Sequence, residues 1–311
     1  MPGCLLVIGS ANIDFVMNTL SVPEAGETIV TKGKYAFVPG GKGANAAVTA
    51  ARLGGNVVFC TRLGDDAYGD RLARIYAENG IDCKFVRIDE NEQTGLAAVM
   101  VEPSGQNRII VYPGANKNIK EYDVEASFTC HPSLVLSNLE IPEQSVIFMS
   151  NLCKIRNIPF VLDCGGISPT FDLSKLAKVD ILSPNETETY KITGIMPTSL
   201  DDCLKACLKL CSMTDVRYVV LKRGERGSYI YDGKYCQICG PYEVAAVDTT
   251  AAGDAFTAAM AVEYMRNGND LYAACRYGNA AGALTVTKRG ALTSLPTRTE
   301  VEAFMANNTH I

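Results

Sequence analysis

The segment Asp248-Thr249-Thr250-Ala251-Ala252-Gly253-Asp254 lies between an apolar run, residues 242–247, and a stretch of small and apolar residues, 255–265. The first run predicts the end of a strand and the second predicts a buried helix. The small residues therefore fall at a helix N-terminus, where free backbone N–H groups and the helix dipole favour an anion. Because no side chain there is larger than methyl, an anion can approach the backbone closely. We predict an anion hole formed by Ala251, Ala252 and Gly253.

One carboxylate, Asp254, stands directly beside this predicted anion hole. Phosphoryl transfer to an alcohol needs both groups, because the backbone holds the phosphates while the carboxylate accepts the hydroxyl proton. The alternative is that Asp254 only complements the helix N-terminus, as aspartate commonly does. We interpret Asp254 as a catalytic base.

The composition limits the class of protein. The chain has 311 residues, 47% hydrophobic and 20% charged, enough for one large domain with an appendage. Its net charge of −5 argues against a nucleic-acid partner, and no apolar run approaches the ~20 residues of a membrane span. The N-terminal ten residues show a strand pattern without a basic leader, so we expect a cytoplasmic protein.

Cysteine is unusually frequent in this chain. Twelve cysteines are scattered along it, but there are two histidines and no spacing typical of zinc ligands. We interpret the cysteines as small buried hydrophobes in a reducing compartment.

A second glycine-rich segment, Pro39-Gly40-Gly41-Lys42-Gly43-Ala44-Asn45, precedes a helix predicted at residues 46–53. It is not a Walker A loop, since no Ser or Thr follows the lysine and the glycine spacing differs. Its glycines allow backbone to approach a ligand, and Asn45 can hydrogen-bond that ligand. Upstream, the strand at residues 5–8 ends in Gly9-Ser10-Ala11-Asn12-Ile13-Asp14. At the carboxyl end of a strand, Asn12 and Asp14 could hold a polyol or merely cap a turn.

Strands alternate with helices over most of the chain. Strands are predicted at residues 57–62, 134–140, 160–163, 179–182, 218–222 and 228–231, and helices at residues 68–79 and 273–286. This alternation predicts a doubly wound, mainly parallel sheet flanked by helices. By contrast, residues 96–101 and 108–112 flank the turn Pro103-Ser104-Gly105-Gln106-Asn107 and predict a hairpin. With the turn-rich segment 15–37, this hairpin predicts a small antiparallel sheet outside the main layer.

The two small-residue segments resemble the signatures of the ribokinase-like (PfkB) carbohydrate kinases. At the segment that corresponds to residues 248–254, that family commonly has Asp-Thr-x-Gly-Ala-Gly-Asp. This chain has Ala251 at the first glycine position of that motif. The Ala-Ala-Gly-Asp spelling is similar to the ribokinases within that family. Weaker motifs follow in the expected order, so the resemblance extends from Gly9 to Pro296.

The resemblance implies an ATP-dependent kinase that phosphorylates the 5-hydroxyl of D-ribose. It implies a sugar site made by Asn12, Ile13, Asp14, Gly41, Lys42, Gly43, Ala44, Asn45, Glu140 and Asp254. It implies ATP contacts from Asn185, Lys222, Arg223, Gly224, Glu225, Arg226, Gly227, Gly253, Asp254 and Asn279. It also makes the small sheet a lid over the sugar, which divides the chain into a core (residues 1–14, 38–93 and 117–311) and a lid (residues 15–37 and 94–116).

Two cations follow from the same resemblance. Glu188 offers a hard oxygen to Mg²⁺, directly or through water, although glutamate at a helix start is also an ordinary dipole partner. A K⁺ site is implied at Asp248, Thr250, Thr285, Lys288, Gly290 and Ser294. One carboxylate among neutral oxygens suits a large monovalent ion better than Mg²⁺, unless Asp248 simply caps its turn.

Some questions stay open at this point. The segment Cys164-Gly165-Gly166 replaces the Pro and Ala of many bacterial ribokinases, and the sequence assigns it no role. The alternatives are a related kinase for fructose, deoxyribose or a nucleoside, and a non-catalytic sugar-binding relative. Aromatic residues at 8% with no Trp disfavour a nucleoside, and Asp254 disfavours a sensor. Since an open lid sheet offers an edge for pairing, we expect a homodimer through the lid.

Overall fold

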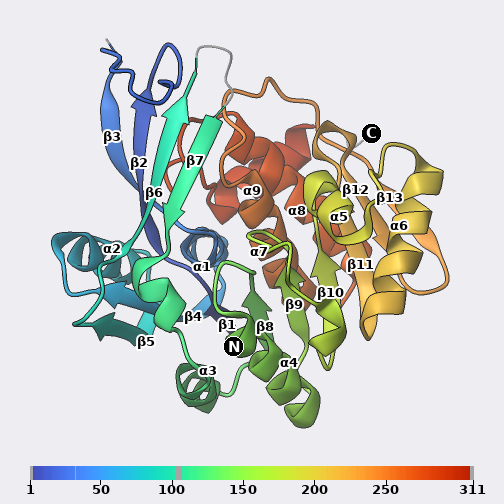
Figure 1. Cartoon of the computed structure of the whole chain (residues 1–311). Helices are drawn as coiled ribbons and strands as arrows, with labels where there is room; N and C mark the ends of the chain where they lie inside the picture. Colours follow the sequence, from blue (N-terminus) through green and yellow to red (C-terminus); the bar gives the residue numbers. More distant parts are fainter. Residues whose placement is uncertain (1–2, 32, 103–106, 309–311) are drawn as a thin grey trace.

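The computed structural model describes residues 3–31, 33–102 and 107–308 and arranges them around two sheets (Figure 1). The larger sheet is nine-stranded, in the order β13-β12-β11-β10-β9-β8-β1-β4-β5. Its strands are β1 (Cys4–Ile8), β4 (Asn56–Gly64), β5 (Asp82–Asp89), β8 (Leu134–Ser137), β9 (Phe160–Asp163), β10 (Val179–Ser183), β11 (Val216–Lys222), β12 (Ser228–Tyr231) and β13 (Cys236–Cys239). Neighbours from β5 to β11 pair in parallel, and the pairs of β12 with β11 and β13 are antiparallel. This arrangement confirms the predicted doubly wound sheet.

Helices cover both faces of the large sheet. They are α1 (Lys42–Arg52), α2 (Ala67–Glu78), α3 (Glu121–Ser127), α4 (Glu143–Arg156), α5 (Glu186–Thr193), α6 (Leu200–Met213), α7 (Ala252–Arg266), α8 (Leu271–Val286) and α9 (Arg298–Asn307). Alternate side chains of β1 enter two separate cores, because successive strand residues point to opposite faces. Leu5 and Val7 pack with α1, α7 and α8, whereas Leu6 and Ile8 pack with α4 and α6.

Cysteines contribute to both cores: Cys239 and Cys275 lie in the first, and a larger group lies in the second. Cys153, Cys203 and Cys207 are buried among the aliphatic side chains of the second core, as expected for cysteines that act as small hydrophobes. Across the described residues, no helix is both long and apolar enough to cross a bilayer.

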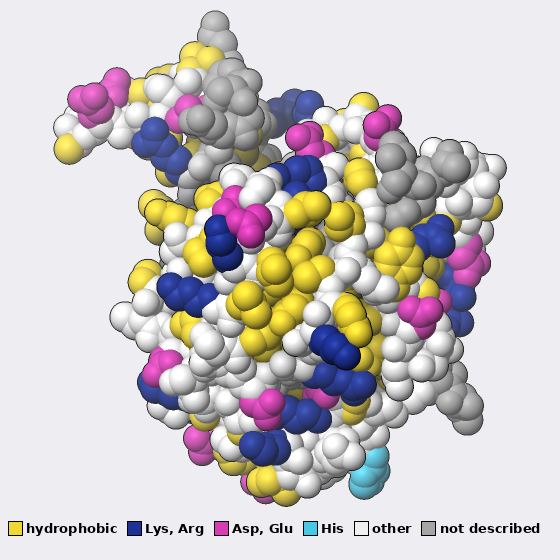
Figure 2. All heavy atoms as spheres, turned by 90° about the vertical axis from the view of Figure 1, so that its right-hand side faces the viewer, with side chains coloured by type: hydrophobic (Ala, Val, Ile, Leu, Met, Phe, Trp, Pro, Cys, Tyr) yellow, Lys and Arg dark blue, Asp and Glu magenta, His cyan; other side chains and the backbone are white. Residues whose placement is uncertain are grey.

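The smaller sheet stands away from this body (Figures 1 and 2). It consists of β3 (Tyr35–Gly40), β2 (Asn12–Asn18), β6 (Gly95–Val101) and β7 (Asn107–Tyr112), in that order. The β2–β3 and β6–β7 pairs are antiparallel, and β2 joins β6 in parallel. Residues 103–106 of the predicted turn lie outside the described residues. The division into core and lid at the predicted boundaries stays a prediction.

The prediction of a strand at residues 242–247 is wrong. That segment is irregular, and β13 already forms the edge of the sheet. The backbone N–H groups of Val247 and Asp248 donate to the carbonyl of Val286, at 2.7 and 3.1 Å, so they bond to the end of α8 instead of a strand. Val247 itself is 54% exposed, which removes the burial that its apolar neighbours suggested.

A buried amide fastens the start of the small sheet to the chain that returns from it. Asn116 lies in the 3₁₀ turn η1 (Gly114–Asn118), which follows β7. Its Oδ1 accepts from the N–H of Ala11 at 2.9 Å, and its Nδ2 donates to Ala11 O and to Asn12 Oδ1 at 3.1 and 2.8 Å. The side chain of Asn116 therefore provides hydrogen-bond partners for both backbone groups of Ala11, just before β2.

We predict that Asn116→Ala destabilises the protein by about 1–3 kcal/mol, because a buried N–H and carbonyl lose their partners. The matched control is Asn151→Ala, since Asn151 is exposed and bonds only Ile147 O of its own helix. Thermal unfolding should show a lower Tm for Asn116→Ala and a control close to wild type. Equal Tm values for the two variants would contradict this role.

Candidate active site

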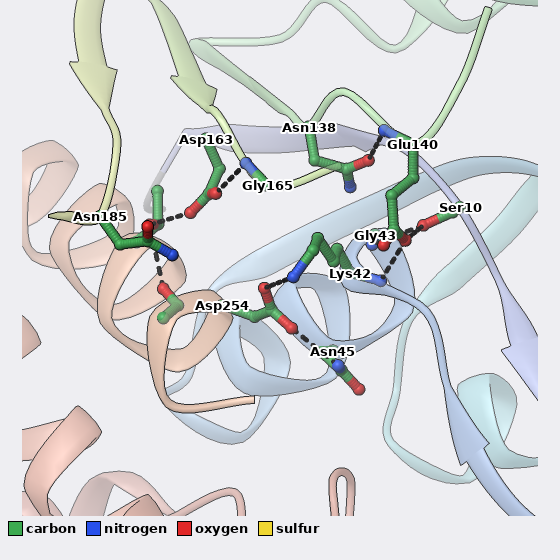
Figure 3. A network of polar contacts seen from close by, with 12 residues as sticks. Ser10, Lys42, Gly43, Asn45, Asn138, Glu140, Asp163, Gly165, Asn185 and Asp254 are labelled. Carbon is green, nitrogen blue, oxygen red and sulfur yellow. Dashed lines mark hydrogen bonds and ion pairs between the residues drawn. The ribbon is translucent and has the colours of Figure 1, made fainter. Parts of the chain in front are cut away.

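The candidate site lies where the carboxyl ends of the central strands meet the first turns of α1 and α7 (Figure 3). The N-cap residue that precedes each helix has a positive φ: Gly41 at 90° before α1 and Ala251 at 62° before α7. A Cβ on Gly41 would lie 2.7 Å from the backbone N of Asn12, so only glycine fits there. Ala251 takes a left-handed conformation that costs about 1–2 kcal/mol for a residue with a Cβ. The turn is thus held in a strained shape at the predicted anion hole, a pattern that marks functional sites.

Asp254 is buried in the first turn of α7, between two side chains of α1 (Figure 3). Asn45 Nδ2 donates to its Oδ2 at 2.8 Å, and Lys42 Nζ lies 3.7 Å from its Oδ1. Burial raises the pKa of Asp254, and the charge of Lys42 opposes this shift. Asp254 in turn raises the pKa of Lys42, so the ammonium stays charged. The carboxylate is therefore oriented and can accept a proton.

The predicted anion-hole residues are not equivalent. The N–H of Ala252 donates to Thr249 O at 3.3 Å, within the turn itself. Gly253 lies against the large cleft described below. The N–H of Ala252 is therefore already used within the turn, and its bond to Thr249 helps to set the shape of the turn.

Glu140 lies on the opposite side of Lys42 from the helix α7. Its Oε2 accepts from Ser10 Oγ at 2.6 Å and from the N–H of Lys42 at 3.2 Å. Its own N–H donates to Asn138 Oδ1 at 3.0 Å, which fixes the turn that follows β8 (Figure 3). The predicted strand at 134–140 is shorter than expected, since β8 ends at Ser137. That earlier end lets Glu140 turn toward the site.

The structure brings together most of the predicted sugar-site residues. Asp14 lies against Gly40, where an added Cβ would be 2.3 Å from Asp14 Oδ2. Ile13 and Ala44 are fully buried in the core, backbone included, so this structure presents neither predicted residue to a ligand. Gly43 serves packing, because a Cβ there would lie 2.5 Å from the carbonyl carbon of Gly9.

A cleft of about 1250 Å³ opens on the other side of Gly253. Eight of the predicted ATP contacts line it: Lys222, Arg223, Gly224, Glu225, Arg226, Gly227, Gly253 and Asn279. Apolar walls come from Tyr242, Val244, Ala246, Phe256, Ala283 and Val286. Asp254 lines a separate small cavity with Lys42, Asp163 and Thr257, and Asn185 pairs through its backbone with Lys222.

Several of the predicted ATP contacts use their side chains within the protein, among them Arg226 and Asn279. Arg226 binds the carboxylate of Glu186 and the carbonyls of Pro197 and Thr198. Asn279 Nδ2 donates to the carbonyls of Cys239 and Gly240 at 3.1 and 2.8 Å. These side chains shape the wall of the cleft, and they have fewer free donors for a ligand.

The predicted cation ligands lie in two segments that touch. Asp248 Oδ1 accepts from the N–H and hydroxyl of Thr250, and Oδ2 accepts from the N–H of Gly290 at 2.9 Å. The hydroxyls of Thr285 and Ser294 donate to carbonyls of their own segments, which leaves their oxygen lone pairs available. Lys288 differs, because its ammonium binds Glu300 at 2.8 Å and only its carbonyl could face a cation.

Glu188 lies at the start of α5, where it is almost buried. It forms a capping box with Asn185, whose side-chain and backbone N–H groups donate to its two oxygens at 2.9 and 2.8 Å. Each carboxylate oxygen keeps a further lone pair, so the dipole role and a magnesium role are compatible. Among the described residues, no three His, Cys, Asp or Glu side chains gather to hold a metal ion. A magnesium ion here would therefore take its further ligands from neutral oxygens, such as water, phosphate or carbonyl groups.

Sequence reasoning did not identify Asp163 and Thr257, which contact Lys222 in the centre of the site. A signal existed, since Asp163 ends a buried strand at the carboxyl edge of the sheet. The structure also gives a packing role to Gly165 and Gly166, to which the sequence assigned no role. A Cβ on Gly165 would lie 2.6 Å from Lys42 Cδ, and one on Gly166 would lie 2.3 Å from Glu140 Cγ. Both glycines make room for predicted site residues.

Comparisons with known proteins agree with this geometry. The pfkB family of carbohydrate kinases matches residues 4–298. A ribokinase of Arabidopsis thaliana is 37% identical over 306 residues, 96% of this chain and 79% of that protein. A ribokinase of Haemophilus influenzae is 33% identical over 307 residues, 98% of this chain and 99% of that protein. The solved structure of an Arabidopsis thaliana ribokinase complexed with ribose and ATP has a TM-score of 0.89 at 35% identity, covering 98% of this chain and 99% of that one. Because the family match spans nearly the whole sequence, this chain belongs to the pfkB family of carbohydrate kinases.

Proposed function

We propose that this protein is a ribokinase that transfers the γ-phosphoryl group of ATP to the 5-hydroxyl of D-ribose. The observation that carries the proposal is the buried Asp254, oriented by Asn45 and Lys42 at the start of α7. Beside it lie Gly253 and a cleft large enough for a nucleotide. The relatives named as ribokinases support ribose as the acceptor. A panel of ribose, deoxyribose, fructose and nucleosides, scored for ADP release, tests this choice.

The proposed reaction uses one base and one anion hole. Asp254 accepts the proton of the 5-hydroxyl while that oxygen forms a bond with the γ-phosphorus. The bond from the γ-phosphorus to the bridging oxygen breaks, and ADP leaves with that electron pair. N–H groups of the turn 251–253 face the transferred group and stabilise its developing charge. Lys42 keeps its ammonium between Asp254 and the sugar side, and Glu140 and Asp14 accept sugar hydroxyls.

Two cations belong to the proposal. Magnesium bound to the ATP phosphates would neutralise charge during transfer, with Glu188 holding it directly or through water. Potassium would be held by Asp248, Thr250, Thr285, Gly290, Ser294 and the carbonyl of Lys288. Asp248 and the N–H of Gly290 already join the two segments, so a cation there would stabilise the turn that forms the anion hole.

We further propose a homodimer through the small sheet. β7 is an edge strand with Ile109, Ile110, Val111 and Tyr112 exposed, an apolar edge that a second copy could cover. The cytoplasmic location and the absence of nucleic-acid and membrane partners stay predictions from the sequence.

Replacing the base should separate chemistry from binding. We predict that Asp254→Asn lowers kcat by about 10²–10⁴-fold, because the 5-hydroxyl proton loses its acceptor. Ribose binding, measured by calorimetry, should survive, since Asn keeps the contact with Asn45. Asp180→Asn, at the opposite end of the sheet, is the control. Near-normal turnover in a folded Asp254→Asn protein would reject the assignment.

A pH dependence follows from Asp14. Burial, with the charges of Glu140 and Asp254, raises the pKa of Asp14 to about 7. In the free protein this carboxyl is therefore neutral below that pH and loses capacity to accept sugar hydroxyls. We predict that kcat/KM for ribose falls as pH drops below about 7, and that Asp14→Asn loses this limb. The same acidic limb in wild type and Asp14→Asn would assign it to another group.

Potassium should activate the protein. In an ATP-saturated ribose assay in a bulky organic-cation buffer, we predict that added K⁺ or Cs⁺ raises the rate more than Na⁺ does. One misplaced donor of an anion hole can cost about 10²–10³-fold, so the activation should be large. Asp248→Asn should reduce it, because the site then lacks its charged ligand. A rate indifferent to K⁺ would reject the site.

A further inference from the structure

A buried carboxylate at the end of β9 binds three different parts of the site. Asp163 is 6% exposed, and its Oδ2 lies 2.5 Å from both Lys222 Nζ and Thr257 Oγ. Its Oδ1 accepts from the N–H of Gly165 at 2.8 Å (Figure 3). The carboxylate thus joins the end of β11, the first turns of α7 and the loop after β9. Both of its oxygens accept from protein groups, so Asp163 is fixed in direction.

Lys222 lies between this carboxylate and the anion hole. It ends β11, is 8% exposed and lines the nucleotide-side cleft. A Cβ added to Gly253 would lie 3.6 Å from its Nζ, so the ammonium is next to the turn that would face the transferred phosphoryl group. Although burial opposes the shift, Asp163 and Glu188 raise the pKa of Lys222, which keeps it charged.

Thr257 ties the same carboxylate to the helix that carries the base. It follows Gly253 by one helical turn, and its Oγ lies 3.0 Å from Gly253 O. The contact with Asp163 is shorter, and the charged oxygen is the stronger acceptor for its single proton. Lys222 Nζ also donates to Thr257 Oγ at 3.3 Å. The position of the ammonium is therefore set relative to the first turn of α7.

We propose that Asp163 is a positioning residue that holds the Lys222 ammonium at the anion hole, where Lys222 contacts the transferred phosphoryl group. A lysine has a long flexible stem, and a charge fixed in advance needs no reorganisation during the reaction. This inference rests on the proposed kinase function and adds a residue that acts through Lys222 without touching the substrate. Lys42 would serve the sugar side of the same reaction, so each substrate would meet its own ammonium group.

The test compares Asp163→Asn, Lys222→Met and the double variant in the full-length protein. One measurement is kcat with ribose and MgATP. The second, which does not depend on the sugar, is the affinity for the β,γ-imido analogue of ATP relative to ADP. Asp180→Asn is the matched control, because Asp180 is also buried, lies 3.1 Å from Lys178 and bonds the N–H of Phe160 at the opposite end of the sheet.

We expect kcat to fall about 10²–10³-fold in Lys222→Met and at least tenfold in Asp163→Asn. The preference for the imido analogue over ADP should drop roughly 5–100-fold in both, since the contact with the γ-phosphoryl group is lost. The double variant should be no worse than Lys222→Met alone, and Asp180→Asn should keep wild-type values for both measurements. An effect that is only structural would lower Tm and leave the nucleotide preference unchanged.

Four results would overturn the proposal. They are unchanged kcat in a folded Asp163→Asn protein, a lowered Tm with an unchanged nucleotide preference, a double variant that loses the product of both single losses, and the same losses in Asp180→Asn. If Asp163→Asn does not fold, Thr257→Val decides between the same outcomes, because it removes one anchor and keeps the charge pair. The wild-type protein could leave ribose unphosphorylated while the preference for the imido analogue over ADP still drops in Asp163→Asn and Lys222→Met. That result would reject the ribokinase proposal and retain the role of Asp163.

Discussion

Buried charge is the constraint on which the centre of this protein depends. Asp163, Glu188 and Asp254 are nearly buried where the strands end, and two ammonium groups, of Lys42 and Lys222, compensate them. Removing one partner of a buried pair leaves an uncompensated charge, which typically costs about 3–5 kcal/mol. Because each lysine interacts with more than one carboxylate, these side chains form a single electrostatic network. In the proposed function, this network has a sugar side at Lys42 and a nucleotide side at Lys222.

This network exists only because backbone segments approach one another very closely. Gly43 at the start of α1 touches Gly9 at the end of β1, and a Cβ on Gly278 of α8 would lie 2.9 Å from Phe256 O of α7. Such contacts let α1, α7 and α8 pack at short distances. Side chains from the first turns of α1 and α7 then meet over the sheet edge (Figures 1 and 3). Small residues in this protein therefore set the distances between charged groups.

The smaller sheet begins directly beside the site. Asn12 pairs with Gly40 and with Gly95 in the smaller sheet, while its side chain accepts from Asn116 at the end of the return path. Gly40 immediately precedes the segment that begins α1. The predicted sugar-site residues Asn12 and Asp14 thus lie at the junction of the two sheets. A displacement of the smaller sheet would act on Asn12 and Asp14 directly, with no intermediate layer.

Local pattern alone predicted the fold class and the region of the two helix starts that form the site, because strand–helix alternation and small residues are visible within short windows. Both helices begin earlier than the predicted residues 46 and 255, at Lys42 and Ala252. Hydrophobicity wrongly predicted a strand at residues 242–247, where the backbone bonds to α8 and no neighbouring strand is present. The Asp163–Lys222 pair joins residues far apart in sequence, and no local window contains both. The same applies to Gly165 and Gly166, whose role depends on Lys42 and Glu140 packing against them. Tertiary structure decided these points, because the energy of a buried charge or a close backbone contact depends on what surrounds it in space.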